Sequence, residues 1–181
     1  MGEMPSGEDS RLYFILTKDL GFIMAIATGV RLLKSKLRFQ LSTFAYIDLE
    51  LVRGKNIWRI VNAYQRENNM FFKTPRADIF ARLSLLVRRM VHGEEENGKL
   101  FEEILETRKL LSEEKFSPAE ADQLELVSVA RILSSLGYFD GRGKYEEVLT
   151  GRLSRGILPK AAILRGELVR DINSALKESQ L

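Results

Sequence analysis

The chain has 181 residues, of which 45% are apolar, and its formal net charge is +3. This length and composition exclude a disordered chain and allow one domain with a real hydrophobic core or two small ones. The absence of cysteine excludes disulfides, cysteine zinc sites and thiol nucleophiles, and the single histidine, His92, leaves no partner for a histidine metal site or a Ser-His-Asp relay. His92 itself is expected to be a cation at a helix C-terminus or a plain surface residue.

The sequence also contains no signal for membranes or for phosphate-cradling loops. No run of eighteen apolar residues occurs, and the N-terminus MGEMPSGEDSR carries acids where a secretory signal carries basic residues. No glycine-rich nucleotide-binding loop is present. We therefore expect a cytoplasmic binding protein rather than an enzyme, with no membrane partner and no small-molecule substrate.

Short β-rich runs alternate with turn signals in the first third of the chain. They predict strands at 11–17, 22–28, 45–53 and 57–64. In the third strand, Ile47, Leu49 and Leu51 alternate with acids, so one face is expected to be buried. The first two runs are apolar on both faces, as expected for strands enclosed in a barrel or packed beneath another layer.

Between the second and third predicted strands lies the cationic segment, residues 29–44, with the sequence GVRLLKSKLRFQLSTF. Its apolar residues recur at helical spacing, at Val30, Leu33, Leu37 and Leu41. Three of its cations repeat that spacing on the adjacent face, at Arg31, Lys34 and Arg38. The pattern predicts a short helix or a helical turn that is held in place by its leucines. Of three interpretations, the short length disfavours a membrane-surface helix, and a solvated stripe and a clamp for phosphates remain.

The hydrophobic period becomes helical after Thr74 and Pro75. Helices are predicted at 75–92, 99–111, 117–136 and 159–178, with one helical turn at 145–149. The run SPAE, residues 117–120, is a capping box with proline at the first helical position. Strands followed by helices predict an α+β chain with a β domain at 1–73 and a helical domain at 74–181.

Positive charge is concentrated in the first domain. Between Gly29 and Ile60 only Asp48 and Glu50 are acidic. The same stretch contains seven basic residues: Arg31, Lys34, Lys36, Arg38, Arg53, Lys55 and Arg59. Such a distribution is typical either of solvated faces that differ in charge or of a surface for an anionic partner.

Four segments carry a family likeness, namely GEDSRLYFILTKDLG, IATGVRLLKSKLRFQLSTF, LELVRGK and ARILSSLGY. In this order and spacing they resemble the bacterial RecO family of DNA repair and recombination mediators. The matching residues of the cationic segment and its flank are Ala27, Gly29, Arg31, Lys34, Ser35, Lys36, Leu37, Leu41 and Phe44. Thr28, Ser42 and Thr43 depart from the family pattern. The resemblance implies an N-terminal OB-fold barrel followed by an all-helical domain.

The resemblance also implies function. Family members bind and anneal single- and double-stranded DNA, load RecA together with RecR onto DNA coated by single-strand-binding protein, and contact the acidic C-terminal tail of that protein. None of this chemistry needs a catalytic residue. An OB-fold binds single strands with a positive groove and aromatic platforms, so we expect DNA to contact the seven basic residues named above. Trp58 is expected either to stack on a base or to pack in the core.

Three departures from the family pattern qualify these expectations. Only residues 1–6 precede the Gly7 turn, so either the first barrel strand is missing or the start is misassigned. The cysteine zinc module of many relatives is absent, so no zinc or other cofactor is expected. The tail-binding site cannot be transferred, because Leu126 and Val127 stand where some relatives have basic residues. Four nearby cations offer a substitute: Arg131, Arg152, Arg155 and Lys160.

Two alternatives to the mediator function remain open. The first is an adaptor of the same fold that binds RecR or single-strand-binding protein without significant DNA binding, for which the missing strand and the reduced cationic motif are the reasons. The second is an RNA-binding OB protein, which the resemblance disfavours.

Overall fold

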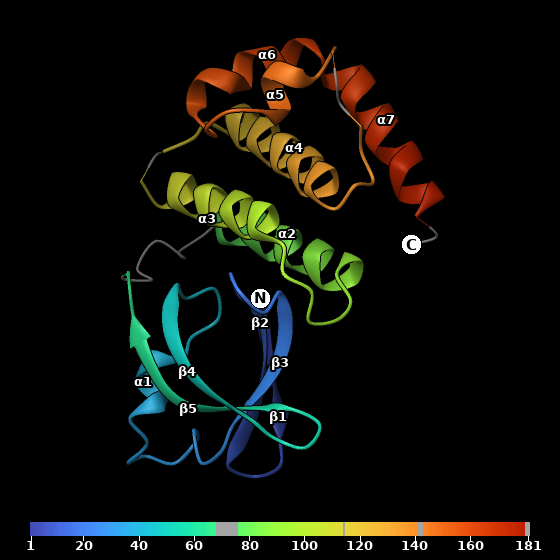
Figure 1. Ribbon diagram of the computed structural model, residues 1–181. Coiled ribbons are helices and arrows are strands. Elements are labelled where there is room, and N and C mark those ends of the chain that lie inside the picture. The colour runs from blue at the N-terminus through green and yellow to red at the C-terminus, as the bar shows by residue number, and fades with distance from the viewer. Residues whose placement is uncertain (68–75, 114, 141–142, 180–181) are drawn as a thin grey trace. The chain divides into compact units, whose positions relative to one another are not determined.

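Five strands form the N-terminal sheet of the computed structural model, which describes residues 1–67, 76–113, 115–140 and 143–179 (Figure 1). They are β1 Gly2–Ser6, β2 Ser10–Leu16, β3 Phe22–Ala27, β4 Ile47–Arg53 and β5 Trp58–Gln65. The order is β1-β2-β3-β5-β4, and only the β3–β5 pair is parallel. This connectivity confirms the predicted OB-type barrel. The four predicted strands are also confirmed, with ends that differ by at most two residues.

β1 corrects the expectation of a missing first strand. Gly2–Ser6 pairs antiparallel with β2, with Glu3 opposite Tyr13 and Pro5 opposite Arg11. Gly7 makes the turn between the two strands with a φ of 75°, a left-handed conformation that favours glycine. The sequence GEMPS gives little strand signal, because glycine and proline are unfavourable inside strands. Proline is tolerated here because β1 is the first strand in the sheet order.

The barrel core is built from one face of each strand. Its buried residues are Tyr13, Ala25, Ala27, Val30, Leu41, Ile60 and Ala63. Alternate residues of β4 pack against this core, at Ile47, Leu49 and Leu51, as the alternation predicts. Met24, on the opposite face of β3, is exposed.

The cationic segment is mostly turns, and the predicted short helix or helical turn is limited to α1, Leu37–Gln40. Gly29 has a φ of 67°, and its carbonyl accepts a 3.1 Å hydrogen bond from the Leu32 amide. Val30 and Leu41 are buried in the barrel, whereas Leu33 is 85% exposed. The segment is therefore fixed at its two ends, and the apolar spacing between them reflects those two anchors rather than a continuous helix.

The helical unit contains six helices among its described residues: α2 Arg76–Met90, α3 Gly98–Glu113, α4 Pro118–Ser135, α5 Glu146–Leu149, α6 Leu158–Ile163 and α7 Arg165–Glu178. A 3-10 turn, Arg155–Ile157, precedes α6. α4 lies in the middle and packs against the other five helices (Figure 1). Its buried residues include Leu124, Val127 and Leu133. α4 is therefore the element around which this unit is built.

The capping box at the start of α4 is confirmed. Ser117 Oγ accepts a 3.3 Å hydrogen bond from the Glu120 amide, and Glu120 Oε2 accepts one of 2.9 Å from the Ser117 amide. The Ser117 amide and the Arg155 guanidinium stabilise the Glu120 carboxylate, which lowers its pKa to about 2. These bonds satisfy the backbone amides of Ser117 and Glu120, which have no intrahelical partners at the start of the helix.

The predicted helix at 159–178 is divided at Leu164, where α6 ends and α7 begins. Gly166 follows the break by two residues, and glycine has the lowest helix propensity of any residue except proline. The break lets each helix bury its own apolar residues, Leu158 and Ala161 in α6 and Leu168 in α7.

The two compact units of the chain are Met1–Lys73 with Val91–Glu96, and Thr74–Met90 with Asn97–Leu181. The segment Val91–Glu96 therefore joins the barrel unit, although the predicted boundary assigned it to the helical domain. No helix in the described ranges is long and apolar enough to cross a membrane.

Candidate nucleic-acid interface

The cations of the cationic segment form no ion pair with any residue that the structure describes. All four side chains are exposed: Arg31, Lys34, Lys36 and Arg38. None of them lies within salt-bridge distance of a carboxylate in the described part of the chain. The loop is held by its backbone, because the Arg31 amide donates a 3.0 Å hydrogen bond to the Asp9 carbonyl. Four unpaired positive charges on one short segment produce a local positive potential that attracts polyanions.

An exposed aromatic ring lies among these cations. Phe39, in α1 directly after Arg38, is 73% exposed. Its backbone is held to the barrel, because Gln65 Nε2 of β5 donates to the Phe39 carbonyl at 3.3 Å. Phe39 was not among the predicted site residues, although an aromatic residue inside a cationic run is a signal for base stacking. Phe39 is therefore an exposed aromatic candidate for base stacking, in addition to Trp58.

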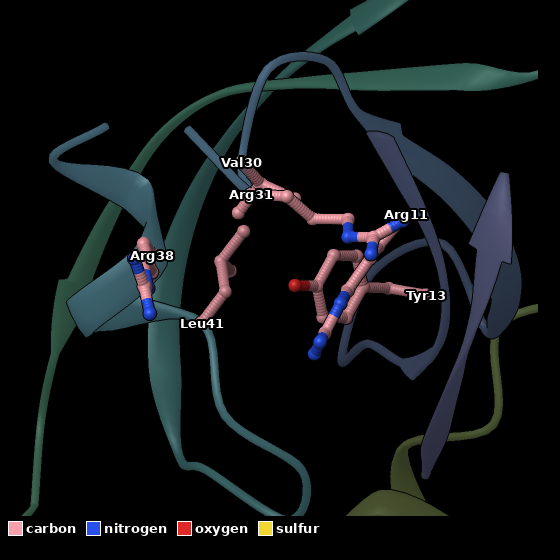
Figure 2. A pocket seen from close by; sticks show the side chains of 6 residues that line it. All are labelled: Arg11, Tyr13, Val30, Arg31, Arg38 and Leu41. Carbon is pink, nitrogen blue, oxygen red and sulfur yellow. The ribbon is translucent and has the colours of Figure 1, made fainter. Parts of the chain in front are cut away.

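Three arginines converge on a pocket of about 430 Å³ at the end of the barrel (Figure 2). We call it the arginine pocket, and its lining residues are Arg11, Tyr13, Val30, Arg31, Arg38 and Leu41. β2 contributes Arg11 and Tyr13, which point to the same face because they are two residues apart in a strand. The other four residues come from the cationic segment, whose buried anchors Val30 and Leu41 bring it over the barrel end.

The electrostatics of the arginine pocket are set by β1 and β2. Arg11 forms an ion pair with Glu3, which lies opposite Tyr13 in the β1–β2 register. Burial raises the pKa of Tyr13 to about 12, and the Glu3 charge acts in the same direction. A hydrogen bond with Glu3 also raises this pKa, so the Tyr13 hydroxyl keeps its proton at neutral pH.

Arg53 and Trp58 do not line this pocket. The Arg53 guanidinium lies 4.8 Å from the centre of the Trp58 ring and forms an ion pair with Glu94. Trp58 Nε1 donates to the other oxygen of the same carboxylate at 3.0 Å, and Arg53 lowers the pKa of Glu94. Trp58 also packs against the barrel core, so its position favours the packing role over stacking.

Lys55 and Arg59 are exposed and lie elsewhere on the barrel. Lys55 is in the turn between β4 and β5. Arg59, on β5, pairs in register with Val52 and with Ile26. Of the seven predicted cations, the structure thus brings Arg31 and Arg38 together with Arg11 at the arginine pocket, whereas Arg53 is engaged with Glu94.

Most of the basic residues suggested for the acidic tail of single-strand-binding protein already have partners within this chain. Arg131 is 1% exposed, and its guanidinium donates to the carbonyls of the loop at 148–151. Arg155 pairs with Glu120, and Lys160 pairs with Glu147. Arg131 is therefore excluded as a surface cation by its burial.

No three His, Cys, Asp or Glu side chains lie close enough to hold a metal ion within the described ranges.

Comparison with known proteins identifies the first domain. Residues 1–67 match the family model described as "Recombination protein O N terminal". Residues 1–67 are thus similar to the N-terminal domain of the RecO family. The "DNA repair protein RecO" of Acaryochloris marina (strain MBIC 11017) is 42% identical over 65 residues. This similarity covers 36% of the present chain and only 22% of that protein.

The predicted resemblance is thus confirmed for the RecO domain, which includes the whole cationic segment, Arg11, Tyr13 and the β4–β5 hairpin. The helical unit lies outside the matched residues.

Proposed function

We propose that this protein is a DNA repair and recombination mediator that binds single-stranded DNA through its cationic segment. The observation that carries the proposal is the set of unpaired cations around the exposed Phe39 on an OB-type barrel. The cations would contact phosphates, and the Phe39 ring would stack on a base. Both features are those by which OB-folds bind single strands.

The remaining predicted DNA contacts extend this surface. Lys55 and Arg59 are exposed and available to phosphates, as is Arg11 in part. Arg53 and Trp58 would contribute to DNA binding only after displacement of the Glu94 carboxylate, which occupies their donors. Glu94 competes for the same groups that a phosphate would use.

The wider activities of the proposed mediator follow from the RecO domain. They are annealing of complementary strands, binding of double-stranded DNA, and loading of RecA together with RecR onto DNA coated by single-strand-binding protein. Contact with the acidic tail of that protein is part of the same proposal, and Arg152 is an exposed cation available for it in the helical unit.

The adaptor alternative loses one of its two reasons, because β1 is present and the barrel does not lack its first strand. Its second reason, the reduced cationic motif, is offset by the Arg11 side chain that joins Arg31 and Arg38. DNA binding is therefore favoured over protein binding alone.

Fluorescence polarisation with labelled single-stranded DNA at low salt tests the proposal. The triple variant K34A/K36A/R38A should bind at least about tenfold more weakly, because each lost phosphate contact removes a favourable charge interaction. A matched control, K99A/R165A/K177A, removes the same charge from exposed positions of the helical unit. It should bind nearly as well as the unmodified chain.

Two results would reject the proposal. Absence of DNA binding by the unmodified chain at low salt would favour the adaptor. An equal loss in the control variant would show that net charge, and not the cationic segment, governs binding.

A further inference from the structure

The arginine pocket differs from the rest of the proposed DNA surface because its charges face one hollow. Arg38 lies on one side of it, Arg11 and Arg31 lie on the other, and the Tyr13 hydroxyl is directed between them (Figure 2). Three of its lining residues, Tyr13, Val30 and Leu41, are buried. Lys34 and Lys36, by contrast, do not line it.

We propose that the arginine pocket binds a phosphomonoester at the end of a nucleic-acid strand. This inference rests on the proposed function and specifies which part of the DNA the pocket recognises. Planar guanidinium groups bind phosphate oxygens through paired, charge-assisted hydrogen bonds, and three of them can approach one phosphate from different sides. The Tyr13 hydroxyl lies between them, where it can contact the same phosphate.

The charge of the pocket matches a terminal phosphate better than an internal one. Three arginines contribute three positive charges, and the ion pair between Glu3 and Arg11 removes one of them. Two positive charges therefore remain. An internal phosphodiester carries one negative charge, whereas a phosphomonoester carries roughly −1.5 to −2 at pH 7.

The shape of the pocket leads to the same conclusion. An internal phosphate has the strand continuing on both sides and needs a groove that is open at both ends. In the arginine pocket the three guanidinium-bearing residues lie around the buried side chains of Tyr13, Val30 and Leu41, so one terminal phosphate could contact several of them. Its volume of about 430 Å³ lies within the range of small-molecule sites and leaves room for the last nucleotide.

The test compares oligothymidines that differ only at their ends. The arms are a strand with a 5′-phosphate, a strand with a 3′-phosphate, a strand with hydroxyls at both ends, and a covalently closed circle. One of the phosphorylated strands should bind about tenfold more tightly than the hydroxyl strand and the circle, as expected for several charge-assisted hydrogen bonds. The arm that shows the preference identifies which strand end enters the pocket.

Variants then assign the preference to the pocket. R31Q/R38Q should abolish it, and Y13F should reduce it while keeping the buried ring. The matched control K34Q/K36Q removes two charges from the same segment but not from the pocket, so it should weaken binding to all four strands and leave the ratio between them unchanged.

The outcomes separate this inference from the proposed function. Equal binding of all four strands would overturn the inference and leave single-strand binding intact. An unchanged preference in R31Q/R38Q would overturn it as well. Failure of every strand to bind at low salt would overturn the proposed function and, with it, the role of the pocket.

Discussion

Replacement of Arg131 by methionine should strongly destabilise the helical unit. The Arg131 side chain is buried in α4 and makes four hydrogen bonds. Its Nε donates to the Val148 carbonyl at 2.9 Å, and its terminal nitrogens donate to the carbonyls of Gly151 at 3.0 Å and Thr150 at 3.1 Å. An ion pair of 3.2 Å joins it to Glu103 of α3. Methionine keeps much of the apolar volume and removes every donor.

The expected loss of stability is about 3–5 kcal/mol, the usual cost of removing one partner from a buried ion pair. The Val148 carbonyl contributes further, because Val148 is buried and its unpaired oxygen cannot reach water easily. Thr150 and Gly151 are exposed, so solvent can replace part of their lost bonds. The estimate therefore lies toward the lower end of the range, at about 3 kcal/mol.

Urea denaturation followed by circular dichroism measures this free energy of unfolding, because most of the helix signal comes from the helical unit. A second variant, R131M/E103Q, should recover part of the loss, since it removes the carboxylate that R131M leaves without a counter-charge. A loss below about 1 kcal/mol in R131M would refute the argument that this side chain joins α4 to the loop at 148–151.

The pH dependence gives an independent check on the same reasoning. Burial raises the pKa of Glu103 above its usual value, and Arg131 opposes that rise. Without Arg131 the folded-state pKa should rise further, so the carboxyl is protonated in the folded variant at mildly acidic pH. A raised folded pKa of an acid costs stability above that pKa. The difference between R131M and the unmodified chain should therefore be smaller at pH 4 than at pH 7.

Four further predictions concern single side chains. Phe39→Ala should weaken single-strand binding by about 1–3 kcal/mol even at salt concentrations that screen the cations, while Phe39→Trp should retain it; equal affinities would exclude stacking. Glu94→Gln should release Arg53 for phosphates and make the salt dependence of DNA binding steeper, whereas an unchanged slope would leave Arg53 outside the interface. Ser117→Ala should cost about 1 kcal/mol in urea denaturation. The stability that Glu120 adds should be complete above its unfolded pKa of about 4.5 and disappear as the pH falls to about 2, so Glu120→Gln and the unmodified chain should converge there.

Periodic patterns predicted most of the fold, and they failed where the structure depends on distant contacts. The alternation in β4 and the capping box at Ser117 both specify their elements locally. β1 has no such signal, because glycine and proline are unfavourable inside strands. It forms a strand because it pairs with β2. The leucine stripe of the cationic segment was misleading, since Val30 and Leu41 are anchors in the barrel core and Leu33 is a surface residue.

The sequence predicted which cations belong to the site but not how they are arranged in space. Charge counting found Arg31 and Arg38 because they lie in an acid-free run. Arg11 was not found, since only the β1–β2 register and the fold-back of the cationic segment bring it to the same pocket. Arg53 was expected to contact DNA, and Trp58 either to stack on a base or to pack in the core. Both contact Glu94, which is far away in the sequence, so no local pattern indicates the contact.

The salt dependence of single-strand affinity tests the central claim most directly. Each phosphate contact with a single strand contributes about −0.7 to the slope of log K against log salt. The four unpaired cations of the cationic segment, Arg31, Lys34, Lys36 and Arg38, therefore predict a slope of about −2.8 or steeper. The triple variant K34A/K36A/R38A should have a slope shallower by about 2. Identical slopes for the two proteins would contradict the account, because they would mean that these cations do not contact the DNA backbone.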